Sequence, residues 1–266
     1  MFRWCSYCQS YMGKSIPFNK FFLTHGICSD CERQERYLHE SSDNIKEIQT
    51  LFESLHNSAS SGSQINVDTF IESAKSLGIS DIDIFIGLIQ PQLHELGRLY
   101  EACAISIAIE NRFSAFAETV LHELGFANGH IANDKSESGI LVLTESNQHT
   151  LGIKAISLFL TKNNVSHRVF YPGLPNHEIL ALIDDCTPSF LGLSVTHEQS
   201  CLEVVILLDE LAAQDKTSLP IIIGGVDNQN AIIEECIRRS PLCVMQYDGN
   251  LKKMLDFLVG STKPLG

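Results

Sequence analysis

The pattern of hydrophobic and polar positions divides the chain into a helical part and a later α/β part. From Val67 to about Leu124, apolar residues recur roughly every three to five positions, as they do along one face of a helix. These positions are Leu88, Leu93, Leu96, Leu99, Tyr100, Ile105, Ile109, Phe113, Phe116 and Val120. Four helices fit this stretch, with breaks near Gly78, Pro91 and Cys103, and together they predict a small helical bundle.

From Gly139 onward, short apolar runs alternate with amphipathic segments of helical length. The runs are Ile140–Leu143, Arg168–Tyr171, Phe190–Val195, Ile221–Ile223 and Leu242–Met245. The helices between and after them are expected near 151–162, 176–186, 199–213, 228–239 and 250–259. This order predicts a flavodoxin-like α/β domain, with an open parallel sheet of five strands and helices on both faces. Ligands bind such sheets at the carboxyl ends of the strands, so a site is expected there.

Polar segments separate these regions, and the chain is therefore predicted to be multi-domain. The predicted parts are a four-cysteine module at 1–40, a linker at 41–66, a helical bundle cap at 67–130 and the α/β domain at 137–260. The serine-rich stretch Asn57–Ser63 has the composition of a flexible linker. The polar, glycine-containing stretch Gly125–Ser138 is expected to connect the bundle to the α/β domain.

Composition narrows the classes of protein that the chain can be. It has 44% hydrophobic and 19% charged residues, enough apolar material for a core, and a formal net charge of −13. Such a surface repels phosphate backbones, so direct DNA binding is not expected. No apolar run is long enough to span a bilayer, and the first five residues do not have the pattern of a signal peptide. We therefore expect a cytoplasmic protein without membrane partners, whose nine cysteines are thiols or metal ligands.

Four of the cysteines form two Cys-x-x-Cys pairs near the start of the chain. Cys5 and Cys8 are separated from Cys28 and Cys31 by 19 residues, a spacing typical of a four-cysteine zinc site. Four thiolates close the coordination shell, so such a zinc ion would be structural. An iron–sulfur cluster and a redox pair are the alternatives. The segment His25–Cys31 resembles short cysteine modules attached to bacterial sensor proteins, which implies a use in docking or in stabilising a dimer.

Polar residues and glycines gather where three of the predicted strands end. They are Asn147, His149, Gly152, Ser194, Thr196, Gly224 and Gly225. A histidine in a strand-to-helix loop can direct a ring nitrogen at a metal, and Asn147, two positions earlier, can hold its other nitrogen. Gly152 permits close approach of a bulky ligand, and the pair Gly224-Gly225 leaves room for a large group beside the sheet.

These residues resemble the pattern of the cobalamin-binding family, which is Asp-x-His-x-x-Gly, then Ser-x-Leu or Ser-x-Thr, then Gly-Gly. The resemblance implies that His149 replaces the dimethylbenzimidazole of the cofactor as the lower ligand of cobalt. It also implies that the displaced nucleotide tail enters a slot lined by Ser194, Thr196, Gly224 and Gly225. A flavodoxin-like domain for another ligand is the alternative.

One residue departs from the family pattern. Asn147 stands where Asp is usual. An amide oxygen can accept a hydrogen bond from the imidazole, but it lacks the charge-assisted strength of a carboxylate. His149 is therefore expected to be a weaker donor to cobalt. The segment Gln148–Gly152 resembles the light-sensing and antirepressor branch of the family more than its methyl-transfer branch.

The helical bundle carries a second resemblance. The segments Gln90–Tyr100 and Ile105–Asn111 resemble the module that covers the upper face of cobalamin in the same proteins. In the light-sensing regulators a Trp is followed at the tenth and eleventh positions by Glu and His. Tyr100 stands at the Trp position, Glu110 is retained and Asn111 replaces the His. The resemblance implies that all three contact the cofactor, although Tyr100 could instead be a core residue and Glu110 could lie at a solvated edge.

The replacement of that histidine by Asn111 bears on the light response. In the resembling photoreceptors, light breaks the cobalt–carbon bond and the histidine then binds cobalt. An amide oxygen is a poor cobalt ligand beside imidazole. We therefore expect water or another histidine, such as His94 or His122, to take that position.

The sequence favours a cobalamin-binding sensor or regulator, light-responsive if the cofactor is alkylated, that signals to a regulatory protein and so affects transcription. The cofactor would be adenosyl-, methyl- or hydroxocobalamin, and a homodimer is left open. The chain has no paired-carboxylate motif, nucleophile elbow or phosphate-binding glycine loop, so a self-contained enzyme is not expected. The alternatives are a corrinoid carrier, as the methyl-carrying subunit of a methyltransferase, and a haem-binding sensor with His149 on iron.

Overall fold

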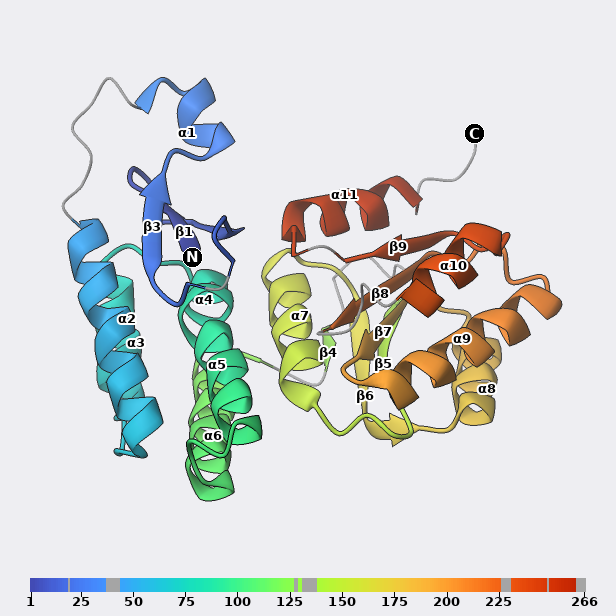
Figure 1. Cartoon of the computed structure of the whole chain (residues 1–266). Coiled ribbons are helices and arrows are strands. Elements are labelled where there is room, and N and C mark those ends of the chain that lie inside the picture. The colour runs from blue at the N-terminus through green and yellow to red at the C-terminus, as the bar shows by residue number, and fades with distance from the viewer. Residues whose placement is uncertain are drawn as a thin grey trace. The chain divides into compact units, whose positions relative to one another are not determined.

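The computed structural model describes residues 1–18, 20–36, 44–126, 129–130, 138–225, 231–247 and 249–261 (Figure 1). The chain forms two compact units, Met1–Gly125 and Phe126–Gly266. The end of the predicted cysteine module at 37–40, parts of the predicted linkers at 41–43, 127–128 and 131–137, and the first residues of the helix predicted near 228–239 lie outside the described residues. Among the helices that the structure describes, none is sufficiently long and apolar to cross a membrane.

The first unit begins with a small sheet that carries the cysteines. Its strands are β1 (Phe2–Cys5), β2 (Tyr11–Lys14) and β3 (Leu23–Gly26), in the order β2-β1-β3. β1 pairs antiparallel with β2 and parallel with β3. The short helix α1 (Ser29–Arg33) follows, and the Cys28 side chain caps its first turn.

The rest of this unit is helical. It comprises α2 (Asn44–Ser61), α3 (Val67–Ser76), α4 (Asp81–Asp83), the π-helix η2 (Ile84–Ile89), α5 (Gln90–Glu101) and α6 (Ile107–Glu123). The breaks predicted near Gly78 and Cys103 are confirmed, and both residues have positive φ angles. The break predicted at Pro91 is wrong, because η2 continues directly into α5 with Pro91 as the second residue of α5.

The linker predicted at 41–66 is also wrong where the structure describes it. Residues 44–61 form α2, which buries Ile48, Phe52, Leu55 and Ala59 at helical spacing. The serines near its end do not break it, since the hydroxyls of Ser60 and Ser61 donate to carbonyls one turn back, at His56 and Ser58. Apolar spacing therefore outweighs the linker-like composition of Asn57–Ser63.

The cysteine-bearing sheet is not a separate domain, contrary to the predicted boundary at residue 40, because it belongs to the same compact unit as the helices. Aromatic side chains join the two parts: the Phe2 ring lies 5.7 Å from that of Phe52 in α2, and Phe21 lies 5.2 Å from the same ring. Trp4 is fully buried. Its indole lies over Gly87 of η2, where an added Cβ would come within 2.5 Å of the ring.

The second unit contains the predicted α/β domain, with one extra strand. Its strands are β4 (Gly129–His130), β5 (Gly139–Thr144), β6 (His167–Leu174), β7 (Leu191–Val195), β8 (Ile221–Gly225) and β9 (Val244–Gln246). They lie in the order β4-β6-β5-β7-β8-β9. The five strands from β5 to β9 are parallel, as predicted, whereas β4 pairs antiparallel with β6 within the segment predicted as a linker.

The helices of this unit cover both faces of the sheet (Figure 1). They are α7 (Thr150–Lys162), α8 (Asn176–Cys186), α9 (Glu198–Ala213), α10 (Ala231–Arg239) and α11 (Leu251–Ser261). Ile140 and Val142 of β5 pack in one core with residues of α8, α9 and α10. Leu141 and Leu143 alternate with them and are also buried, facing the side that α7 covers.

The strand order reverses its direction between β5 and β7. Numbered from β5, the parallel strands follow the flavodoxin-like order 2-1-3-4-5. The crevice at such a switch point is where open α/β sheets bind ligands. The loops after β5 and β7 are therefore the ones that matter for a site.

Candidate functional site

Asn147 lies at the centre of the switch point and connects the two loops. It is fully buried. Its Nδ2 donates to the Ser194 carbonyl at 2.7 Å, and its Oδ1 accepts from the Thr196 hydroxyl at 2.9 Å and from the His149 backbone amide at 3.0 Å. The sequence-predicted residues Asn147, His149, Ser194 and Thr196 are thus brought together, through the amide of Asn147.

His149 is exposed at the start of α7, where it is the N-cap residue. The expectation that Asn147 holds its imidazole is wrong, because the Asn147 oxygen accepts from the backbone amide of His149 instead. Within the described part of the chain, the His149 ring has no hydrogen-bond partner. The ring is therefore accessible to a ligand, while its backbone is fixed to the buried amide.

A second set of hydrogen bonds, which no sequence motif indicated, fixes the loop after β5. Ser146 donates from its backbone amide and its hydroxyl to the carboxylate of Glu203 in α9. His197 caps α9 by accepting from the Ser200 amide, and its Nε2 lies 3.2 Å from the Ser146 carbonyl. His197 could have been suspected from its place between a strand and a helix, whereas Glu203 lies too far along α9 for any local pattern to indicate it.

The Glu203 carboxylate is stabilised in its charged form. Partial burial alone would raise its pKa, but the hydrogen bonds that it accepts, including those from Ser146, lower the pKa below its ordinary value. A carboxylate that remains ionised is a stronger acceptor for the loop than a neutral acid. These hydrogen bonds hold Ser146, and with it the start of the loop after β5, against α9.

The three glycines of the motif have different surroundings. A Cβ at Gly152 would meet no atom within 4 Å, so α7 has open space beside its first turn. Gly225 has a φ of +131°, and a Cβ there would lie 1.8 Å from the Val195 carbonyl oxygen. A Cβ at Gly224 would lie 3.4 Å from Tyr247, an ordinary contact distance. The close approach of β7 and β8 is thus sufficient to explain Gly225, whose predicted role was only to make room for a ligand.

Tyr100, Glu110 and Asn111 belong to the first unit, whereas the residues of the sheet edge belong to the second. Tyr100 is 44% exposed near the end of α5, so it is not a core residue of that unit. Glu110 accepts a hydrogen bond from the Ser114 hydroxyl within α6, and Asn111 is exposed. Their contact with a ligand stays a prediction.

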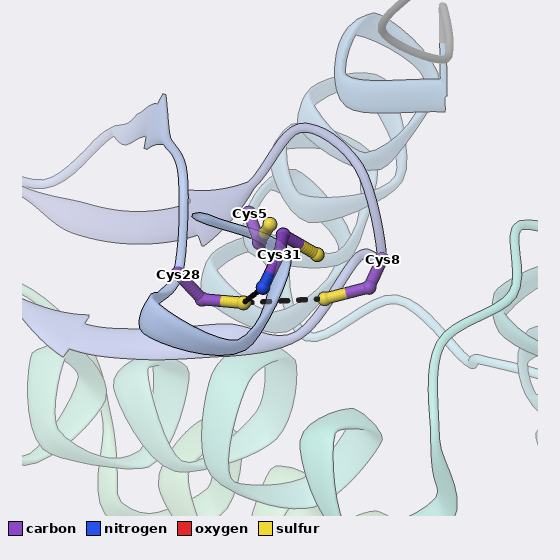
Figure 2. Close-up of side chains that lie close together, drawn as sticks. All are labelled: Cys5, Cys8, Cys28 and Cys31. Atoms are coloured by element: carbon purple, nitrogen blue, oxygen red, sulfur yellow. Dashed lines mark hydrogen bonds between the residues drawn. The ribbon is translucent and has the colours of Figure 1, made fainter. Parts of the chain in front are cut away.

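The four cysteines near the start of the chain form a second candidate site (Figure 2). Their sulfurs all lie within 4.8 Å of one another, and the four thiols are free. The Cys31 amide donates to the Cys28 sulfur. Burial alone would raise the pKa of Cys5, but hydrogen bonds from backbone amides, including that of Cys8, lower it to about 7. Burial instead raises the pKa of the Cys8 and Cys31 thiols. The geometry nevertheless directs all four sulfurs at a common centre.

The chain shares its fold with proteins of known structure. No family model and no curated protein matches it. Its fold is similar to that of the monomethylamine corrinoid protein of Methanosarcina barkeri, over 71% of this chain and 90% of that protein, with a TM-score of 0.57 and 20% identity.

Two further solved structures are more distant, both at 14% identity. The methanol:cobalamin methyltransferase complex of Methanosarcina barkeri matches 90% of this chain and 95% of its own, with a TM-score of 0.38. A cobalamin-binding protein from Desulfitobacterium hafniense matches 80% and 98%, with a TM-score of 0.40. Both similarities are too weak to add to the assignment of the fold.

Proposed function

We propose that this chain binds a corrinoid at the carboxyl edge of its parallel sheet, with His149 as the lower ligand of cobalt, and that it acts through a partner protein. The observation that carries the proposal is the state of His149. Its ring is exposed at the switch point of a corrinoid-protein fold, while its backbone is bonded to the buried Asn147. This arrangement supports His149 as a metal ligand whose ring is accessible before the metal binds.

The residues around His149 fit a bulky cofactor. Gly152 has no neighbours where a side chain would be, so a flat macrocycle could approach the first turn of α7. Ser194, Thr196, Gly224 and Gly225 lie at the ends of β7 and β8 and would line the slot for the nucleotide tail. Bound there, the corrinoid would supply an upper cobalt position that can carry an alkyl group.

In this proposal the helical unit contributes Tyr100, Glu110 and Asn111 to the upper face. Tyr100 presents an exposed ring, which is suitable for covering a macrocycle. Asn111 places an amide at the position where the resembling photoreceptors have the histidine that binds cobalt after illumination. Water or another side chain, such as His94 or His122, would take the upper position if an alkyl group were lost.

The protein is proposed to be a sensor, and light is the proposed signal if the bound corrinoid is alkylated. The sequence offers no constellation for self-contained catalysis, and its charge of −13 disfavours a direct contact with DNA. A regulatory partner protein, through which the sensor would affect transcription, fits both facts. The function as a corrinoid carrier in methyl transfer is the second candidate, and the similarity in fold to the monomethylamine corrinoid protein favours it.

Binding of hydroxocobalamin to the full chain tests the role of His149. We expect His149→Ala to change the cobalt absorption spectrum and to weaken retention about tenfold or more, because the lower ligand is lost. His130→Ala is the matched control, since His130 pairs with the first residue of β6 at the opposite edge of the sheet. Equal spectra and affinities for both variants would refute the assignment. Haemin in place of the corrinoid tests the haem alternative in the same assay.

A further inference from the structure

The geometry of the four cysteines matches the coordination shell of a single metal ion. A tetrahedral zinc ion with Zn–S distances of about 2.3 Å separates its sulfurs by about 3.8 Å. The sulfurs of Cys8 and Cys28 are 3.7 Å apart, and all four lie within 4.8 Å of one another. Four sulfurs this close surround one ion, whereas a polynuclear iron–sulfur cluster would distribute them over several metals.

The fold of the first sheet creates this arrangement. Cys5 ends β1, and Cys8 lies in the turn that leads to β2. The parallel pairing of β1 with β3 places Cys5 opposite Gly26, so the chain reaches the N-terminus of α1 beside the first pair. Cys28 and Cys31 then face Cys5 and Cys8 across the centre (Figure 2). An ion at this centre would join segments that lie 20 residues apart in sequence.

The residue next to Cys5 connects this centre to the helices. Trp4 is fully buried against Gly87 of η2. A Cβ on Gly87 would lie 2.5 Å and 2.8 Å from two atoms of the Trp4 ring and 3.0 Å from the Tyr11 Cβ. Only glycine admits both side chains here. The π-helix thus carries a contact surface shaped for β1 and β2, and it leads directly into α5.

We propose that Cys5, Cys8, Cys28 and Cys31 bind one structural zinc ion, and that this ion holds Trp4 and Tyr11 against η2. Metal occupancy then controls the stability of the helical unit, including α5. The reason is physical: without the ion, no metal bonds join the turn after β1 to the N-terminus of α1, and β1 and β2 lose the clamp that keeps Trp4 and Tyr11 in place against η2. The proposal is independent of corrinoid binding.

The test uses the full chain and its one tryptophan, so that fluorescence reports on the Trp4 contact alone. We expect about one zinc per chain, the number that one four-thiolate site requires. Removing it with a chelator should shift the Trp4 emission to longer wavelength and lower the thermal midpoint of the helical circular dichroism signal. Cys8→Ser should lose the zinc and show the same two changes, while Cys103→Ser, at an exposed cysteine outside the cluster, should keep the zinc and both signals.

A second variant separates metal binding from its effect on the helices. Gly87→Ala should retain zinc, but its added methyl group displaces Trp4, so the emission should already be shifted and should respond little to the chelator. Iron in place of zinc, or a folded, metal-free chain with four reactive thiols, would overturn the metal assignment. Zinc that can be removed without any change in Trp4 emission or in the thermal midpoint would overturn the coupling to η2.

Discussion

At the scale of single residues, the hydrogen bonds of Asn147 explain why this chain has an amide where the family that it resembles has Asp. Its Nδ2 donates to the Ser194 carbonyl in a fully buried position. A carboxylate has no hydrogen to donate and would place an oxygen against that carbonyl. The Ser194 carbonyl therefore favours an amide over a carboxylate at position 147. Because the Asn147 side chain bonds to the backbone amide of His149, it does not contact the His149 imidazole.

A substitution measures this preference. Asn147→Asp should lower the free energy of unfolding by about 1–3 kcal/mol, because a buried donor is lost and a charge is buried instead. Urea denaturation at pH 7 gives the value. Gln148→Glu makes the same change from amide to carboxylate at the adjacent exposed residue and should leave the midpoint nearly unchanged. Equal stability of the two variants would show that the hydrogen bond to the Ser194 carbonyl does not contribute to the free energy of unfolding.

At the scale of elements, the pairing of β7 with β8 depends on Gly225. Its φ of +131° disfavours any other residue, and a Cβ would collide with the Val195 carbonyl. We expect Gly225→Ala to reduce the free energy of unfolding by more than the approximately 1–3 kcal/mol of backbone strain alone. Gly249→Ala, with a φ of +92° and no atom within 4 Å, imposes strain without the collision and should reduce it less. If the two variants unfold at the same urea concentration, the collision is relieved by a shift of β8.

The elements also show how far sequence patterns reach. Four of the five parallel strands lie within two residues of their predicted bounds, whereas β6 ends three residues later than predicted. Strands that are buried along their whole length, such as β5 and β7, give clear apolar runs. Helix α2 was missed because its serines suggested a linker, although Ile48, Phe52 and Leu55 carried a helical spacing. The two-residue strand β4 has no pattern of its own. The network of Ser146, His197 and Glu203 joins residues 51 to 57 positions apart, and only the folded chain brings them together.

At the scale of the whole molecule, the proposed sensor and the alternative carrier differ in their response to the loss of an alkyl group. A sensor needs two states that its ligand stabilises differently. We therefore expect the protein loaded with adenosylcobalamin to change its absorption spectrum and its hydrodynamic size on illumination, either by rearrangement or by a change between monomer and dimer. Size-exclusion chromatography with light scattering, in darkness and in light, measures this.

The matched control for that experiment is the same protein with hydroxocobalamin, which has no cobalt–carbon bond and should keep its size in light. Asn111→Ala should leave the illuminated spectrum nearly unchanged, because an amide contributes little to cobalt binding. A spectrum that changes at constant size would favour the carrier, whose task requires only the exchange of the alkyl group.

The hydrogen bonds of Asn147 have a consequence for the kinetics of binding. Because one buried amide ties the backbone of His149 to β7, the loop that precedes α7 is already ordered before any ligand arrives. If His149 binds cobalt as proposed, it then loses little conformational entropy on binding, and the affinity is higher than it would be for a disordered loop. Substitutions that loosen this loop should therefore act mainly on the residence time of the bound molecule, with a smaller effect on how fast it is captured.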